Sequence, residues 1–278
     1  MSVSEQKKMA EFVSAFNHIA RHKHRYEVFR DFVTMAAIAI HNAVNKYDKL
    51  EAEYLQIAGK YSRDELSLFC ALFGRLVLLL DENPRNILGE LYMSLDLGNA
   101  GTGQYFTPSD VSELMAQISY GESLRTLSKP FVTISEPACG AGGMVLAFTK
   151  IMIANGHDPA KAMWAQCQDI DRLAALMCYI QLSLWNIPAV VIVGNTLTLE
   201  SREVLYTPQH YLGRWSAKLQ ERELREVDDD LSDGLQSTAP YDLSESKNTH
   251  STDSADSILD SEILMFTRDG DAQFDFGF

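Results

Sequence analysis

A short glycine-rich segment between an apolar β-branched run and a helical pattern constrains the fold of this chain more than any other sequence feature. The segment, residues 136–143 (EPACGAGG), follows residues 131–135 (FVTIS). Strand and helix patterns then alternate along the chain: strands over 131–135, 163–168 and 190–193, and helices over 144–155 and 171–184. This alternation predicts an α/β fold with a parallel-rich sheet and right-handed crossovers.

The glycine-rich segment lies where open parallel sheets bind their ligands, at the carboxyl end of a strand. Gly140, Gly142 and Gly143 would let the backbone turn tightly and approach a ligand without a Cβ in the way. No Gly-Lys-Ser/Thr follows, which disfavours ATP hydrolysis, and the dinucleotide fingerprint GxGxxG is not matched. Glu136 would repel a pyrophosphate but suits a cation such as the ammonium of an amino-acid moiety. The alternative is a turn that serves packing only.

Polar side chains also follow the second and third predicted strands. A carboxylate at the position of Asp169 is where nucleotide-binding sheets hold a ribose diol, although its spacing of 29 residues from Gly140 exceeds the usual value of about 20. Either Asp169 or Asp171 could instead cap the next helix, and we expect Asp171 to do so. Asn195 could bind the amino edge of an adenine, or act only as a turn residue.

The first 95 residues read as helical. Apolar side chains recur at helical spacing in three stretches: Phe12, Phe16 and Ile19; Phe29, Phe32, Val33 and Ala36; and Phe69, Leu72, Phe73, Leu76 and Leu80. Ser62 and Glu65 form a capping-box pattern before the third stretch. Residues 97–103 are loop-like, and Thr107-Pro108 predicts the cap and first position of another helix. That helix would carry four apolar side chains inward: Val111, Leu114, Met115 and Ile118.

The acidity of the chain is concentrated at its C-terminal end. The formal net charge of the 278 residues is −14, and residues 221–278 hold 16 acidic and 4 basic side chains. Such a segment cannot bury enough apolar area to offset its chain entropy, so we expect it to be disordered. Its apolar end could dock on a partner or be incidental. We therefore expect three parts: a helical N-terminal region (1–96), a core (97–220) and an acidic tail (221–278).

Several classes of function are disfavoured. The four cysteines show no CxxC spacing, which argues against a structural zinc site or a disulfide framework and for a reducing, cytoplasmic environment. No apolar run is long enough for a membrane span, so we expect no membrane partner. A basic stripe with interleaved aromatic residues, typical of nucleic-acid-binding proteins, is absent from the sequence.

Four ordered motifs resemble the S-adenosylmethionine half of adenine-N6 DNA methyltransferases, in particular the modification subunit of type I restriction–modification systems and its smaller phage and plasmid relatives. These motifs are residues 103–108 (GQYFTP), 136–143 (EPACGAGG), 167–171 (CQDID) and 194–197 (GNTL). The resemblance covers roughly residues 85–200. It implies a Rossmann-like methyltransferase core, S-adenosyl-L-methionine as cofactor, DNA as substrate, and a partner subunit that supplies target recognition or completes the site.

The resemblance also implies which residues bind the cofactor. The GQYFTP segment and the glycine-rich turn would hold the methionine part, Asp169 the ribose hydroxyls, and Asn195, where many relatives carry Asp, the adenine. The implied cofactor-binding residues are Gln104, Tyr105, Phe106, Thr107, Pro108, Glu136, Pro137, Ala138, Cys139, Gly140, Ala141, Gly142, Asp169, Ile170 and Asn195.

The catalytic motif of the family is missing from this sequence. Adenine-N6 enzymes carry Asn/Asp-Pro-Pro-Tyr/Phe after the fourth strand, where an amide oxygen and a backbone carbonyl accept the protons of the adenine amine and the ring stacks on the flipped base. Residues 199–215, where a fourth strand is due, contain no such tetrapeptide, and Ala239-Pro240-Tyr241 lacks the Asn. Substitutes would have to come from Tyr206, His210 or Trp215, so the catalytic residues stay unassigned.

Two functions follow from this pattern. The first is an adenine-N6 DNA methyltransferase, active alone or with a partner. The second is a catalytically silent, cofactor-binding relative that acts as a regulatory or interaction protein. Methylation of a substrate other than DNA is a weaker third alternative.

Overall fold

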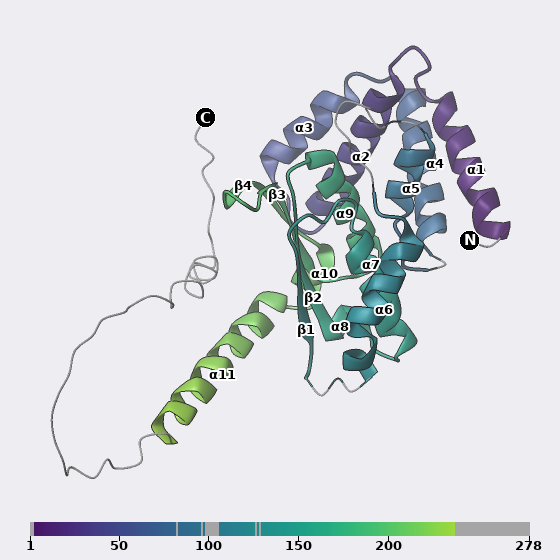
Figure 1. The fold of residues 1–278 in the computed structure, drawn as a ribbon. Helices are drawn as coiled ribbons and strands as arrows, with labels where there is room; N and C mark the ends of the chain where they lie inside the picture. Colours follow the sequence, from purple (N-terminus) through teal and green to yellow (C-terminus); the bar gives the residue numbers. More distant parts are fainter. Residues whose placement is uncertain are drawn as a thin grey trace, which may run out of the picture. The chain divides into compact units, whose positions relative to one another are not determined.

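The computed structural model describes residues 3–81, 83–95, 97, 106–125, 127 and 129–236 (Figure 1). The chain divides into two units, Met1–Trp215 and Ser216–Phe278. Gln104, Tyr105 and residues 237–278, which hold most of the predicted tail, lie outside the described residues.

Helices precede the sheet in the first unit, as the apolar periodicity predicts. They are α1 (Val3–His18), α2 (Arg25–Asn42), α3 (Asp48–Ala58), α4 (Arg63–Leu80) and α5 (Ile87–Ser94). Phe12 and Phe32 are buried and meet edge to face, with 6.2 Å between ring centroids, and Phe32 stacks on Phe69. Ser62 and Glu65 form the predicted capping box at the start of α4. The helical pattern and its buried face are therefore confirmed.

The sheet contains β1 (Val132–Glu136), β2 (Met163–Asp169), β3 (Ala189–Asn195) and β4 (Glu200–Tyr206), in that spatial order. Strands β1, β2 and β3 are parallel neighbours, joined through α7 (Gly143–Ala154), the short α8 (Pro159–Ala162) and α9 (Arg172–Leu184). Alternate residues of β2, such as Ala165 and Cys167, are completely buried, whereas Gln166 and Gln168 are half-buried. The predicted α/β fold with a parallel-rich sheet is confirmed.

Strand β4 runs antiparallel to β3, which makes the sheet mixed. Only residues 196–199 separate the two strands, and a parallel return needs a crossover of a dozen or more residues. Gly194 permits the tight return, because a Cβ at this position would lie 2.0 Å from the carbonyl oxygen of Glu200. The ladder is shifted at this point, between Val193 and Gly194. Strand β4 therefore ends at the edge where β1, β2 and β3 begin, opposite to their carboxyl ends.

Helix α6 (Ser109–Arg125) contradicts the predicted orientation of its apolar face. Leu114 and Ile118 are 61% and 77% exposed, and Val111 and Met115 are exposed as well. The buried side is made instead by Ser112, Ala116, Gly121 and Leu124. These residues are mostly small, which allows α6 to pack closely on α7. The helix also begins at Ser109, so Pro108 precedes it.

The chain continues through α10 (Pro208–Leu212) into α11 (Trp215–Gln236). Residues 221–236 were expected in the disordered tail, but they are helical. An i,i+4 ion pair between Glu221 and Arg225, with 3.7 Å between charged atoms, supports the helix there. Among the described residues, no helix combines the length and apolar character that a membrane span requires.

Candidate functional site

The turns after β1 and β2 are bonded directly to each other. The backbone N–H of Gly140 donates to Oδ2 of Asp169 at 2.7 Å, and the N–H of Cys139 donates to the carbonyl oxygen of Gln168 at 2.9 Å. Because β1 and β2 are parallel neighbours, with Glu136 opposite Cys167, both turns lie at the carboxyl edge of the sheet. The structure thus brings two of the predicted motifs together.

Glycine is required at two positions of the first turn. Gly140 and Gly142 have φ values of +53° and +89°, in the left-handed region that other residues rarely adopt. A Cβ on Gly140 would lie 3.2 Å from the ring of Phe106, and one on Gly142 would lie 3.0 Å from Sγ of Cys178. Phe106, from the GQYFTP motif, therefore contacts the glycine-rich turn, and its ring also packs edge-on against Tyr92.

The carboxylate of Asp169 is held in one orientation by two backbone donors. Oδ2 accepts from Gly140, and Oδ1 accepts from the N–H of Asp171 at 2.8 Å. Each carboxylate oxygen has two lone pairs, so this group can still accept hydrogen bonds from a diol. Asp171 caps α9, because its Oδ1 accepts from Leu173 and Ala174, and the prediction that Asp171 is the cap is confirmed.

Glu136 ends β1 as a half-buried carboxylate. Burial raises its pKa, and a hydrogen bond from the Ala138 N–H at 3.5 Å opposes that effect. A partly desolvated carboxylate attracts a cation more strongly than one in bulk water. The position thus fits an ammonium group.

The turn after β3 is also bonded to the first turn. The hydroxyl of Thr196 donates to the carbonyl oxygen of Pro137 at 2.6 Å. Asn195 acts as a turn residue, since its Oδ1 accepts from the Leu197 N–H at 3.0 Å. Its contact with an adenine stays a prediction. Thr107 and Pro108 are exposed next to Phe106, between the glycine-rich turn and α6.

Sequence reasoning missed a buried amide beneath the glycine-rich turn. Gln181 of α9 is fully buried, and its Nε2 donates to the carbonyl oxygen of Ala141 at 2.7 Å and to Oδ1 of Asn86 at 3.1 Å. Its Oε1 accepts from the N–H of Leu88 at 3.0 Å. The signal available in the sequence was a glutamine among the apolar residues of α9. Gln181 therefore connects the turn to the start of α5.

Three thiols also lie beneath this turn. Cys139, Cys167 and Cys178 are buried and form hydrogen bonds with one another. Those hydrogen bonds, together with burial, raise the pKa of the Cys178 thiol. Within the described part of the chain, no group of three or more His, Cys, Asp or Glu side chains could hold a metal ion. The three thiols belong to the hydrophobic core.

The aromatic side chains around β4 lie away from this edge. Tyr206 pairs with Val190, five residues before Asn195, which corresponds to about 17 Å along β3 at about 3.3 Å per residue. His210 is buried, its Nδ1 accepts from Nε1 of Trp164 at 3.1 Å, and burial lowers its pKa to about 4. Tyr206 and His210 therefore do not replace the missing tetrapeptide at the carboxyl edge.

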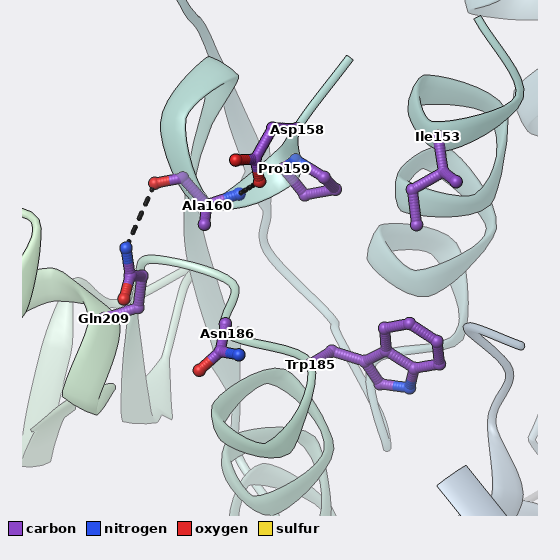
Figure 2. A pocket seen from close by; sticks show the side chains of 7 residues that line it. All are labelled: Ile153, Asp158, Pro159, Ala160, Trp185, Asn186 and Gln209. Carbon is purple, nitrogen blue, oxygen red and sulfur yellow. Dashed lines mark hydrogen bonds between the residues drawn. The ribbon is translucent and has the colours of Figure 1, made fainter. Parts of the chain in front are cut away.

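A hollow of about 500 Å³ lies at the opposite edge of the sheet, where α8 precedes β2 and Asn186 precedes β3. Figure 2 shows its apolar side, made by Ile153, Pro159 and Trp185, across from the amide of Gln209, which donates to the carbonyl oxygen of Ala160. None of the predicted cofactor-binding residues lines it.

Comparisons with known proteins agree with the motifs. The family model described as N-6 DNA Methylase matches residues 85–232. The Type I restriction enzyme MpnII methylase subunit of Mycoplasma pneumoniae is 29% identical over 138 residues, which are 46% of this chain and 24% of that subunit. The chain therefore spans about a quarter of the length of this relative.

A solved structure from Listeria monocytogenes, assigned to the class I S-adenosylmethionine-dependent methyltransferases, is 18% identical. The similarity covers 66% of this chain and 52% of that one, with a TM-score of 0.35.

Proposed function

Because the chain belongs to the N-6 DNA methylase family, we propose that it holds S-adenosylmethionine at the carboxyl edge of β1–β3 and serves the methylation of adenine N6 in DNA. S-adenosylmethionine is the cofactor, and when bound it supplies an activated methyl group on a sulfonium. The residues at the edge fit this group. Two glycines with positive φ leave room for close approach, and two carboxylates, Glu136 and Asp169, offer acceptors for its ammonium and hydroxyl groups.

The hydrogen bond between Gly140 N–H and Asp169 carries the proposal. It joins the turn expected to hold the methionine part to the carboxylate expected to hold the ribose, with 2.7 Å between the bonded atoms. In this arrangement Asp169 orients the ribose, Glu136 binds the ammonium, and Phe106 and Thr107 border the methionine part. Asn195, on the neighbouring turn, faces the same edge and is proposed to contact the adenine.

The chemistry at the adenine amine requires groups that we propose a second polypeptide to supply. A poorly nucleophilic amine needs acceptors for its protons and a ring that holds the base. The sequence has no Asn/Asp-Pro-Pro-Tyr/Phe, and β4 ends at the opposite edge of the sheet. The relative in Mycoplasma pneumoniae is itself named a subunit, which favours an assembly. DNA as substrate favours a cytoplasmic location.

A second candidate function is that of a silent relative that binds the cofactor and regulates or recruits another protein. The missing tetrapeptide favours it. Both candidates require the cofactor, and they differ in whether a partner restores methylation.

Calorimetry with S-adenosylmethionine tests the shared premise. We expect saturable binding to the wild-type chain and its loss in Asp169→Ala and Gly140→Val. Asp158→Ala is the matched control, because Asp158 also accepts from the backbone but caps α8 at the opposite edge. Absence of heat at millimolar cofactor would refute the proposal.

A further inference from the structure

Side chains of β4 and α3 hold the turn that carries Asp169. Arg172, the first residue of α9, donates from Nε and Nη2 to the two carboxylate oxygens of Glu203, at 2.5 and 3.1 Å. Its Nη1 and Nη2 also donate to the carboxylate of Glu53 in α3, both at 2.9 Å. One guanidinium thus joins three elements that are distant in sequence.

Arg202 provides a second attachment on the same turn. Its Nη2 donates to the carbonyl oxygen of Ile170 at 2.6 Å. Arg202 and Glu203 are consecutive on β4, so the antiparallel return of this strand brings both groups to the turn. The segment from Asp169 to Arg172 is therefore held by backbone and side-chain hydrogen bonds at nearly every residue.

Apolar packing does not hold this turn. The Ile170 side chain is 61% exposed, although it is the apolar residue at the centre of the turn. An exposed single ion pair contributes little to stability, but a planar guanidinium bonded in pairs to two carboxylates fixes geometry. The position of the Asp169 carboxylate thus depends on polar contacts, and those of Arg172 and Arg202 come from outside the cofactor motifs.

We propose that Arg172 and Arg202 are positioning residues that hold Asp169 in the orientation needed for a ribose diol. This inference rests on the proposed function. It gives α3 and β4 a role in cofactor binding, through Glu53 and Glu203. Neither arginine is among the residues proposed to bind the cofactor; both hold the backbone from which Asp169 extends.

The test compares two ligands that differ only in the diol. S-adenosylhomocysteine and its 2′,3′-dideoxy analogue are titrated calorimetrically into the wild-type chain and into Arg172→Gln and Arg202→Gln. We expect the wild type to prefer the diol by about tenfold or more, which is the worth of a hydrogen bond to a charged group. Both variants should lose most of this preference, and Arg172→Lys, which keeps the charge but not the planar fork, should retain part of it.

Arg75→Gln is the matched control, because it removes an arginine–glutamate pair between α4 and α1, 3.6 Å long, without touching the turn. It should keep the wild-type preference. If Arg172→Gln does not fold, Arg202→Gln and Glu53→Gln decide the question. Equal weakening of both ligands in the variants, with the preference intact, would overturn the inference and leave the proposed function standing. If the wild-type chain binds neither ligand, both the inference and the proposed function are wrong.

Discussion

Single glycines decide how closely the turns of this sheet approach one another, and they do so for two different reasons. At Gly140 and Gly142 the backbone adopts positive φ, and a side chain would also meet Phe106 or Cys178. At Gly194 the reason is the carbonyl oxygen of Glu200 on the returning strand. The sequence shows that these glycines belong to motifs. It does not show the neighbours that exclude a Cβ, because those neighbours come from other elements.

Gly194→Ala should destabilise the first unit strongly. A Cβ 2.0 Å from the Glu200 carbonyl oxygen would force β3 and β4 apart, which we expect to cost about 3 kcal/mol or more. Gly74→Ala in α4 is the control, since open space surrounds that position and alanine favours helix by about 1 kcal/mol. Chemical denaturation of the two variants should shift the unfolding midpoint in opposite directions. An unchanged midpoint in Gly194→Ala would contradict the observed return of β4.

Thiol reactivity should separate one cysteine from the other three. Cys70 is exposed on α4, whereas the free thiols of Cys139, Cys167 and Cys178 are buried and joined by hydrogen bonds. Burial keeps reagents away from these three thiols, and the raised pKa values of Cys139 and Cys178 also disfavour the thiolate, which is the nucleophile. Hydrogen bonds from the other two thiols lower the pKa of Cys167 to about 5, but this side chain is completely buried. Titration with a chromogenic disulfide should therefore release one equivalent rapidly from the native chain and four after denaturation. Removal of the rapid equivalent by Cys70→Ser would confirm its origin.

Among the elements, α6 shows what apolar periodicity can and cannot tell. Four apolar residues of α6 lie on one face, as predicted, but that face is exposed, and the buried face consists mostly of small residues. Apolar periodicity shows which residues share a face of a helix, but it does not show whether that face is buried. The face of α6 that packs closely on α7 is made mostly of small side chains. In contrast, β1, β2, β3, α7 and α9 could be predicted within one or two residues, because glycines, aspartates and β-branched runs mark their ends. The short α8 was not predicted.

Substitutions on the two faces of α6 should have opposite consequences. Ile118→Glu places a charge on a side chain that is 77% exposed, so we expect the free energy of unfolding to change by less than about 0.5 kcal/mol. Ala116→Glu places the same charge at a fully buried position, which should cost about 3 to 5 kcal/mol. Thermal unfolding of the two variants measures the difference. A large loss in Ile118→Glu would show that this face is covered in solution.

The direction of β4 is the element-scale feature that the motifs did not reveal. The expected fourth strand lies where the pattern put it, but its direction depends on the length of the link after β3. Four residues, 196–199, are too few for a crossover helix, so the strand returns antiparallel. Because β4 returns in this direction, Arg202 and Glu203 reach the Asp169 turn. The sequence around Asp169 does not indicate these contacts.

At the scale of the whole molecule, cofactor binding and methyl transfer are separable. At the carboxyl edge, hydrogen bonds from Gly140 to Asp169 and from Thr196 to Pro137 join the glycine-rich turn to the Asp169 turn and to the Asn195 turn. The sequence contains no Asn/Asp-Pro-Pro-Tyr/Phe tetrapeptide to accept the protons of an adenine amine and stack on the base. The ordered motifs thus allowed the cofactor-binding residues to be predicted from the sequence. For methyl transfer, the sequence showed only that the family's catalytic tetrapeptide is absent.

The purified chain should therefore bind S-adenosylmethionine and yet methylate DNA slowly or not at all. Mispositioning of a reacting group alone costs about 100-fold in rate, and here both the proton acceptors and the stacking ring are missing. Tritium transfer from S-adenosylmethionine to unmethylated DNA measures this directly, with calorimetric binding on the same preparation as the control. Addition of co-encoded proteins should restore transfer if a partner completes the site, and should not if the chain is a silent relative. Rapid formation of N6-methyladenine by the chain alone would contradict the prediction, and groups other than Tyr206 and His210, which lie at the opposite edge of the sheet, would then have to replace the tetrapeptide.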